Sequence, residues 1–238
     1  MVNPEEIVSK LEAIYGRNRK IARFDALEEL VCCMMSQHTA DANSFPAFTR
    51  LLETYPTWQA VVDSGPEHLA ETIRKAGLAN QKSRSIIACL TQIKTLNGDF
   101  TLEPLRTMNT DDAMAWLMGL PGVGPKTASI VLCFNFDRGT IPVDTHVYRV
   151  SWRLGLFGES IGEAKAHAAL RKLVPERLAY RFHSSLIQHG RLMCRAPLPD
   201  CTPCPLKELC EWFAAGGPEH RRAELASKRS QNKLKSRS

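Results

Sequence analysis

A glycine turn, a lysine and an aspartate lie close together in the segment 120–149 of this 238-residue chain. Gly122 and Gly124 form a tight turn, and a helix is predicted to begin directly after it at Pro125, with Lys126 in its first turn. Asp144 follows Lys126 by 18 residues, at the predicted start of the next helix. Glycine turns and helix N-termini leave backbone N–H groups available to an anion. The segment therefore predicts a turn that holds a phosphate backbone and presents an amine to it.

Four of the eight cysteines form a second group that could do chemistry, with the spacing C-x6-C-x2-C-x5-C. They are Cys194, Cys201, Cys204 and Cys210. The segment is rich in proline and has little helical periodicity, so four thiolates can converge on one point. Two disulfides are disfavoured in a reducing compartment. The spacing alone fits zinc and an iron–sulfur cluster equally well.

The cysteine segment also carries basic side chains. One structural role for a bound metal would be to fix a loop that presents Arg191, Arg195 and Lys207 to phosphate. The other four cysteines lie in apolar helical stretches and are interpreted as small core residues. They are Cys32, Cys33, Cys89 and Cys133.

Helical periodicity dominates the chain and strand alternation is scarce, so we predict an all-α fold of about ten helices. Asn3 and Pro4 mark the start of one helix, and Asn109 is expected to cap another. The stretch 26–35 is apolar on nearly every side, which indicates a central buried helix. Glycines are expected to end three helices, at Gly77, Gly98 and Gly190.

Composition places the chain among soluble globular proteins, with 44% hydrophobic and 24% charged residues. It has no apolar run of membrane-spanning length and no secretory signal, so we expect a reducing cytosolic or nuclear compartment. The net charge is +6, but the seven Lys/Arg and two Glu of residues 219–238 supply +5 of it, which leaves +1 for the body. The tail 216–238 is expected to be basic and disordered, with non-specific attraction to phosphate.

Together, the glycine turn, Lys126, Asp144 and the cysteine spacing resemble the endonuclease III-type DNA glycosylases of the helix-hairpin-helix superfamily. The motifs LPGVGxKTA and VDTH are specific, and C-x6-C-x2-C-x5-C is that family's cluster spacing. The similarity extends from Met34 to Cys210. It implies an all-α fold of two helical lobes with a DNA-binding active-site cleft between them, a helix-hairpin-helix motif and a C-terminal [4Fe–4S] loop.

The resemblance also implies a domain division. Residues 20–138 would form a six-helix domain with the helix-hairpin-helix motif, and residues 1–19 plus 139–215 an iron–sulfur cluster domain, followed by the basic tail 216–238. The cluster, and not zinc, is what the resemblance implies for the four cysteines.

Residue roles follow from the resemblance one at a time. Lys126 matches the catalytic lysine, and its place at the positive end of a helix dipole favours the neutral amine that a nucleophile needs. Asp144 matches the catalytic aspartate, and a plain helix N-cap is a compatible role for it. The implied DNA-binding residues are Gln37, His38, Leu78, Gly122, Val123, Gly124, Thr127 and Arg191.

The implied mechanism begins with the damaged nucleotide flipping out of the duplex. Lys126 attacks the sugar C1′ as the base departs, Asp144 supports the developing positive charge, and the resulting Schiff base permits β-elimination on the 3′ side. Leu78 would fill the vacated space as a wedge; a buried helix-end leucine is its alternative interpretation. The expected partner is double-stranded DNA with a damaged base or abasic site, bound by a monomer away from membranes, in a cytoplasmic, nucleoid-associated enzyme.

The chain departs from the family pattern at three positions. His38, preceded by Gln37, stands where the family has a glutamine that probes the vacated space; otherwise it is a polar residue at a helix end. Ala79 stands where a larger residue is common, and Pro125 replaces a basic residue. These departures concern lesion preference, opposite-base discrimination and phosphate affinity.

Three functions compete. The first is a DNA glycosylase with AP lyase activity that removes oxidised pyrimidines. The second is a monofunctional glycosylase for mismatched or alkylated bases, against which Lys126 argues. The third is a non-catalytic helix-hairpin-helix DNA-binding protein with structural zinc.

Overall fold

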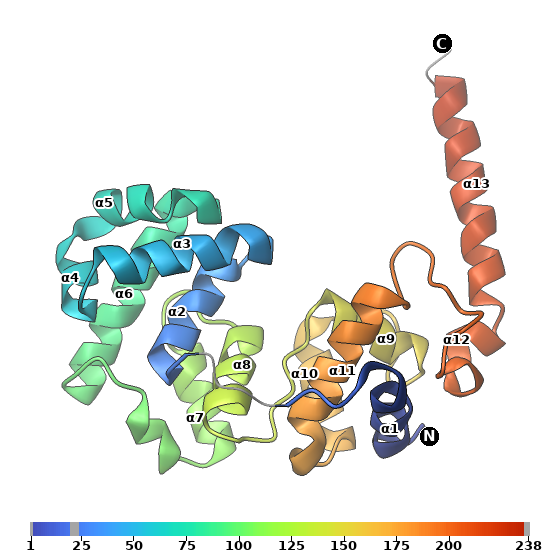
Figure 1. Ribbon diagram of the computed structural model, residues 1–238, viewed down its shortest axis with the longest axis horizontal. Coiled ribbons are helices and arrows are strands. Elements are labelled where there is room, and N and C mark those ends of the chain that lie inside the picture. The colour runs from blue at the N-terminus through green and yellow to red at the C-terminus, as the bar shows by residue number, and fades with distance from the viewer. Residues whose placement is uncertain (1, 20–23, 236–238) are drawn as a thin grey trace. The chain divides into compact units, whose positions relative to one another are not determined.

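The computed structural model of the protein describes residues 2–19 and 24–235. In these residues it contains thirteen α-helices, four short 3₁₀ helices and no strand, which confirms the all-α fold (Figure 1). Three helices go beyond the expected ten: two short ones, α4 (Trp58–Asp63) and α12 (Glu211–Ala214), and the long C-terminal α13 (Gly217–Lys235). A helix of one or two turns shows too little periodicity to be predicted. No helix within the described ranges is long and apolar enough to cross a membrane.

The chain divides into two compact units, which we describe separately. One comprises Lys20–Thr140 and is called the hairpin unit; the other comprises Met1–Arg19 with Ile141–Ser238 and is called the cysteine unit. The predicted cleft between two lobes concerns the placement of one unit against the other, and it stays a prediction.

The hairpin unit is built around α2 (Ala26–Ser36), the predicted central helix. Asp25 caps it by accepting from the backbone N–H groups of Leu27 and Glu28, both at 2.8 Å. Leu30, Val31 and other α2 side chains are fully buried, and α2 packs against α3, α6 and α8. The described part of this unit has seven α-helices where six are expected, because α4 is added. The others are α3 (Asp41–Thr54), α5 (Gly65–Thr72), α6 (Ala79–Asn97), α7 (Thr110–Met118) and α8 (Pro125–Asn135), with the 3₁₀ helices η1 (Arg74–Ala76) and η2 (Glu103–Arg106).

The pair α7 and α8 forms the predicted hairpin. The side chain of Asn109 accepts from the N–H of Asp112 at 2.9 Å, as expected for the cap of α7. Apolar side chains on both helices and in the turn between them are buried in the unit's core: Leu117, Leu120, Val123, Ala128, Val131 and Leu132. This burial fixes the turn and leaves the backbone at Gly122 exposed.

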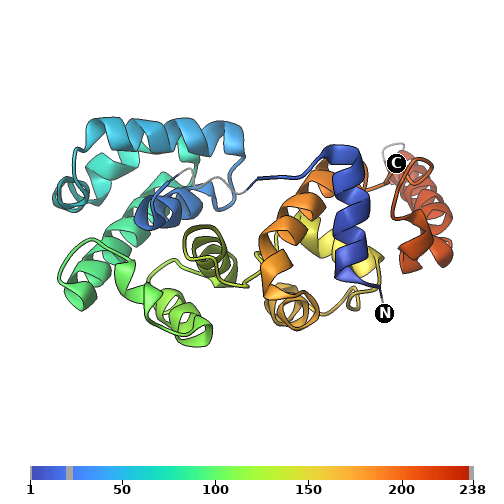
Figure 2. The same ribbon diagram turned by 60° about the horizontal axis from the view of Figure 1, so that its bottom comes forward.

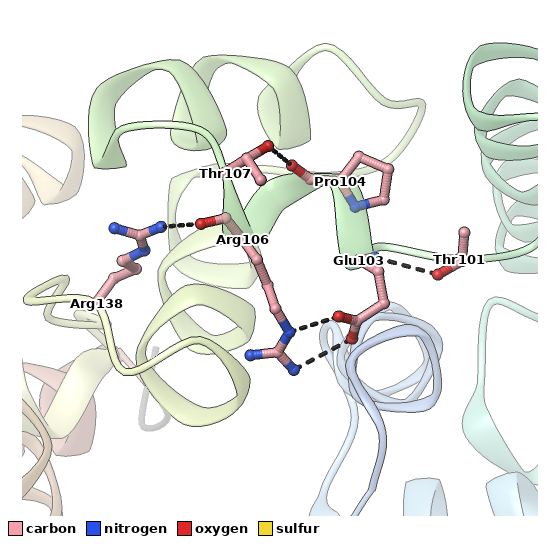
Figure 3. A network of polar contacts seen from close by, with 6 residues as sticks. All are labelled: Thr101, Glu103, Pro104, Arg106, Thr107 and Arg138. Atoms are coloured by element: carbon pink, nitrogen blue, oxygen red, sulfur yellow. Dashed lines mark hydrogen bonds and ion pairs between the residues drawn. The ribbon is translucent and has the colours of Figure 1, made fainter.

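A polar network joins the segment that follows α8 to η2, which precedes α7 in the chain (Figure 3). Arg138, which follows α8, donates to the carbonyl oxygens of Arg106 at 3.0 Å and Met108 at 2.9 Å. The Arg106 guanidinium in turn binds both carboxylate oxygens of Glu103 and lies over the Phe136 ring. The end of α8 is therefore anchored to η2 by charge-assisted hydrogen bonds.

The cysteine unit joins the N-terminal helix to the C-terminal half. In Figures 1 and 2, α1 (Pro4–Tyr15) lies beside α11 (Ala179–Leu192), with which it packs. Asn3 caps α1 as predicted, and Arg181 donates from Nε to Glu12 Oε1 at 2.8 Å, which lowers the pKa of Glu12. Its apolar core includes Ile7, Leu11, Val147, Phe182 and Leu186. The remaining helices are α9 (Thr145–Arg153), α10 (Glu163–Leu173), α12 and α13 (Gly217–Lys235), with the 3₁₀ helices η3 (Glu176–Leu178) and η4 (Lys207–Leu209).

Gly77 and Gly98 end η1 and α6 as predicted, but the expectation that Gly190 ends a helix is wrong. Gly190 lies inside α11, which continues to Leu192. A Cβ there would meet His146 Cβ of α9 at 2.8 Å, closer than carbon atoms can approach. Position 190 therefore requires glycine, because the backbone of α11 packs here directly against the His146 side chain of α9.

Gly190→Ala is accordingly expected to destabilise the protein by about 1–3 kcal/mol, the typical cost of overpacking a core. Chemical denaturation would measure the change. Gly158→Ala is the control, because a Cβ at Gly158 meets nothing within 4 Å. Equal stability of the two variants would contradict this explanation of Gly190.

The expectation of a disordered tail at 216–238 is wrong for most of its length, because α13 occupies Gly217–Lys235. Pro218 stands at the start of this helix, and no glycine or proline interrupts it afterwards. Two ion pairs at a spacing of three residues, Arg221 with Glu224 and Arg222 with Glu219, support its first turns.

Candidate active site

Gly122 gives the hairpin turn its shape. Its φ is +77°, in the left-handed region, and the turn is closed by a hydrogen bond from Val123 N to Leu120 O at 3.2 Å. A Cβ at Gly122 would also come within 3.0 Å of Met34 Cε and 3.1 Å of Ser85 Cβ. Both backbone conformation and packing therefore require glycine here.

Gly124 has a different role, because its backbone is extended and a Cβ would meet nothing within 4 Å. It opens α8, which has no side-chain cap among the residues described. The N–H groups of the first turn are thus left for an external acceptor, at the positive end of the helix dipole. A missing side chain and outward N–H groups make a place where a phosphate can approach closely.

Lys126 lies in this first turn and is exposed. Val123 and Thr127 on either side are buried, with 7% and 5% of their surface accessible. Their side chains cannot reach DNA, so their predicted DNA contacts are restricted to the backbone. Lys126 is the one side chain of the three that can reach a ligand.

Cys33 of α2 is within range of the Lys126 charge. Its Sγ donates to the buried Glu29 carboxylate at 3.6 Å. Burial raises the pKa of the Cys33 thiol well above its ordinary value and the Glu29 charge adds to this, whereas the positive charge of Lys126 acts in the opposite direction. Cys33 therefore remains a neutral thiol at neutral pH, as its interpretation as a packing residue requires.

Gln37, His38 and Leu78 come together on one surface of the hairpin unit. They line a single pocket, whose other lining residues are Met34, Gln81, Lys82 and Ser85. Gln37 Nε2 donates to Gly122 O at 2.9 Å, which links this surface directly to the hairpin turn. Leu78 is 56% exposed, so its interpretation as a buried helix-end leucine is wrong. Three predicted DNA-binding residues and the hairpin glycine thus form one continuous surface.

The backbone of this surface is strained at two points. His38 has φ +53° and Leu78 has φ +48°, both in the left-handed region that costs an L-residue about 1–2 kcal/mol. This conformation turns His38 at the end of α2 and Leu78 before α6 outward. Such strain persists only where surrounding contacts hold it.

Lys82 supplies those contacts. It is only 5% exposed, and its ammonium donates to Met35 O at 2.6 Å, Ala76 O at 2.7 Å and Thr39 Oγ1 at 2.8 Å. The three donors of the ammonium are thereby matched by three acceptors. Hydrogen bonds to a charged group contribute about 1.5–3 kcal/mol each, enough to offset the strain at His38 and Leu78.

Asp144 caps α9 in the cysteine unit, which is one of the two roles predicted for it. Its Oδ1 accepts from the N–H groups of His146 at 2.9 Å and Val147 at 2.7 Å. Within the described ranges Oδ2 has no hydrogen-bond partner. One oxygen thus fixes the carboxylate and the other remains available for chemistry. Lys126 and Asp144 belong to different units.

The four cysteines of the C-terminal segment, Cys194, Cys201, Cys204 and Cys210, line one cavity. Arg153 of α9 binds two of these cysteines. Its Nη1 donates to Cys194 Sγ at 3.3 Å, and its carbonyl accepts from Cys210 Sγ at 3.2 Å. Arg149, one turn earlier, donates from Nε to Cys194 O at 2.9 Å and from Nη2 to Gly190 O at 2.8 Å. The helix that carries Asp144 therefore also anchors the cysteine loop.

His189 of α11 also lines this cavity. Burial lowers its pKa to about 4, so the ring is neutral at pH 7. The Tyr15 hydroxyl lies 3.1 Å from Nδ1, and Cys204 Sγ lies 3.6 Å from Nε2. With Tyr15 donating to Nδ1, the ring proton resides on Nε2 and faces the sulfur.

Burial also governs the thiols themselves. It raises the pKa of Cys201, of Cys204 to about 11, and of Cys210, and the charge of each neighbouring thiolate raises these pKa values further. Four thiolates are therefore unfavourable in this cavity unless a cation compensates their charge.

Sequence reasoning missed four residues that organise these sites. They are Lys82, Arg149, Arg153 and His189. Arg149 and Arg153 stand one turn apart directly after the VDTH motif, a spacing that could have been noticed. Lys82 gave no signal, because nothing in the sequence indicates that it is buried. Arg191, predicted to bind DNA, is exposed at the end of α11.

Comparison with known proteins decides the family. Residues 31–176 match the model of the HhH-GPD superfamily of base excision DNA repair proteins. The endonuclease III of Thermotoga maritima is 33% identical over 213 residues, covering 90% of this chain and 94% of that protein. The chain belongs to the endonuclease III family. The endonuclease III of Rickettsia felis is 34% identical, over 87% of this chain and 95% of its own length.

Solved endonuclease III structures have the same fold. A non-covalent endonuclease III–DNA complex superposes with a TM-score of 0.75 and 30% identity, covering 90% of this chain and 98% of that one. A trapped endonuclease III–DNA covalent intermediate superposes equally well. The matched lengths place both units of this chain within the endonuclease III fold.

Proposed function

We propose that the protein is a DNA glycosylase with AP lyase activity that removes oxidised pyrimidines from duplex DNA through a lysine Schiff base. The observation that carries the proposal is the exposed Lys126 in the uncapped first turn of α8, directly after an open glycine turn. That arrangement combines a phosphate site with a nucleophile on one helix end. Action on chromosomal DNA would make the protein cytoplasmic and nucleoid-associated.

DNA binding would use two kinds of contact. The backbone N–H groups that follow Gly122 and Gly124 would bind a backbone phosphate, which fixes position without reading sequence. Leu78 would enter the space left by the flipped nucleotide, since it is exposed on a turn held in a fixed conformation. Gln37 and His38, on the same surface, would contact the bases beside it.

The chemistry then follows from the two polar groups. The Lys126 Nζ lone pair forms a bond to C1′ while the C1′–N bond breaks and the base leaves with its electron pair. Asp144 Oδ2 would accept the proton released by the amine and stabilise positive charge on the sugar. Ring opening gives the C1′=N imine, loss of a C2′ proton expels the 3′ phosphate, and water releases the lysine.

The four cysteines fit a [4Fe–4S] cluster, which would fix the loop that follows α11. They line one cavity, and burial makes their thiolates dependent on a bound cation. The C-x6-C-x2-C-x5-C spacing is the cluster spacing of the endonuclease III-type glycosylases, the family to which the chain belongs, and it favours a cluster over a single zinc ion.

Cys204→Ser is expected to yield protein that lacks the visible absorption and the iron of the wild type. Wild-type protein should contain about four iron and four sulfide per chain. Cys89→Ala is the control, because Cys89 is buried in the hairpin unit, where burial raises its pKa to about 12. Colourless wild-type protein with one zinc per chain would overturn the cluster proposal.

Substrate choice tests the proposed function. Duplexes carrying thymine glycol, an alkylated purine or a G·T mismatch would be incubated with the wild type, and base release and strand cleavage measured separately. Release of thymine glycol with coupled cleavage is expected. Release from the mismatched or alkylated duplex without cleavage would favour the monofunctional alternative, and binding without release would favour a non-catalytic protein.

A further inference from the structure

Two loops of the hairpin unit converge on one buried ammonium. Residues 37–39 follow α2, and residues 76–78 comprise the last residue of η1 and the two residues that connect it to α6. Lys82 Nζ binds the carbonyl of Met35 at the end of α2, the hydroxyl of Thr39 in the first loop and the carbonyl of Ala76 in the second. Each of the three donors of this ammonium is used to hold a loop or a helix end.

Thr39 completes the connection between the loops. Its hydroxyl donates to Ala76 O, the same carbonyl that Lys82 binds, and receives a hydrogen bond from Lys82. Beyond the loops, Gln37 binds Gly122 O, so the hairpin turn joins the same assembly. The Lys82 ammonium, the Thr39 hydroxyl and the Gln37 amide therefore join the two loops and the hairpin turn in one hydrogen-bonded network.

The two strained residues lie on these loops. His38 and Leu78 are the exposed tips, and each has a left-handed backbone that an L-residue leaves when released. Burial lowers the pKa of Lys82, and the three acceptors favour its charged form.

We propose that Lys82 is a positioning residue, which holds the loops 37–39 and 76–78 in the conformation that enters duplex DNA and so determines how efficiently a base is extruded. The inference rests on the proposed function for its DNA-dependent part. Its structural part concerns the free protein and can be tested without any substrate.

Hydrogen exchange of the free protein tests the structural part. In Lys82→Met the side chain keeps its length and loses its three donors, and amides of residues 37–39 and 76–79 are expected to exchange at least tenfold faster. Amides of α7 and α8 should be unchanged. Lys94→Met is the control, because Lys94 lies on the same helix and is exposed, and its ammonium contacts Gln59 and the Phe100 ring. Unchanged exchange at both loops in Lys82→Met would overturn the inference.

Kinetics tests the functional part. Lys82→Met is expected to lower kcat for thymine glycol release from duplex DNA by about 100-fold, the effect of misplacing reacting groups by about an ångström. KM should change by less than threefold, because the hairpin backbone still binds phosphate. Borohydride trapping on a single-stranded abasic site, which needs no extrusion, should also remain within threefold. Equal losses on both substrates would mean a general structural role and overturn the proposal.

Two further variants keep the test decisive if Lys82→Met folds poorly. Thr39→Val retains Lys82 and removes one shared hydroxyl, and it should show the same selective loss of duplex excision to a smaller extent. Lys82→Arg retains the charge and should recover part of the duplex activity. Wild-type protein that fails to trap on any abasic site would refute the proposed function instead, and the exchange result would still stand.

Discussion

Lys126→Ala is expected to leave no borohydride-trapped adduct with abasic DNA and to lower base release by roughly 10⁴-fold or more, as loss of the nucleophile does in other covalent enzymes. The reason is that Lys126 supplies the only amine in the first turn of α8, beside the open Gly124 backbone. Gel-resolved trapping and single-turnover base release measure the two effects.

The fold should not change in this variant. Lys126 is exposed, and alanine favours helix, so the free energy of unfolding is expected to stay within about 0.5 kcal/mol of the wild type. Lys165→Ala is a matched control, since Lys165 is also exposed in the first turn of a helix, α10. Undiminished trapping by Lys126→Ala, or an equal loss in Lys165→Ala, would contradict the assignment.

Asp144→Asn separates the two roles of the aspartate. Asparagine caps a helix as well as aspartate does, so the hydrogen bonds to His146 N and Val147 N can persist and stability should be nearly unchanged. The charge and the proton acceptor at Oδ2 are lost, so kcat is expected to fall by roughly 10²–10⁴-fold. Thermal unfolding and single-turnover kinetics would be measured on the same preparations.

Asp144→Ala provides the comparison. It should lose activity to a similar extent and also lose about 1 kcal/mol of stability, because the cap of α9 is removed. An Asp144→Asn enzyme with wild-type kcat would show that the residue is only a cap. Loss of activity in parallel with loss of stability in both variants would have the same meaning.

Features that depend on residues close together in the sequence could be predicted. The caps at Asn3 and Asn109, the buried helix α2 and the hairpin between α7 and α8 depend on residues within a few positions of one another. The position of Lys126 in the first turn of a helix and the grouping of the four cysteines could be predicted for the same reason, since motif and spacing lie in one short segment each. Local periodicity and capping are what a single sequence records most directly.

Features that depend on distant contacts could not be predicted. Gly190 has the sequence appearance of a helix end, and only its contact with His146, 44 positions earlier, explains it. Lys82 has the appearance of a solvated helical lysine, yet it binds Met35 O, 47 positions earlier. The same ammonium binds Ala76 O, two residues before Leu78. For the tail, composition indicated disorder, whereas ion pairs within α13 support a helix.

Proteolysis and mass spectrometry of the borohydride-trapped wild-type complex test the central claim most directly. An abasic duplex would be trapped, the DNA digested to a single sugar remnant, and the modified peptide sequenced. We predict that the remnant lies on Lys126, in the peptide that begins the helix after Gly124. A remnant on any other amine, or wild-type protein that forms no covalent complex, would contradict the account.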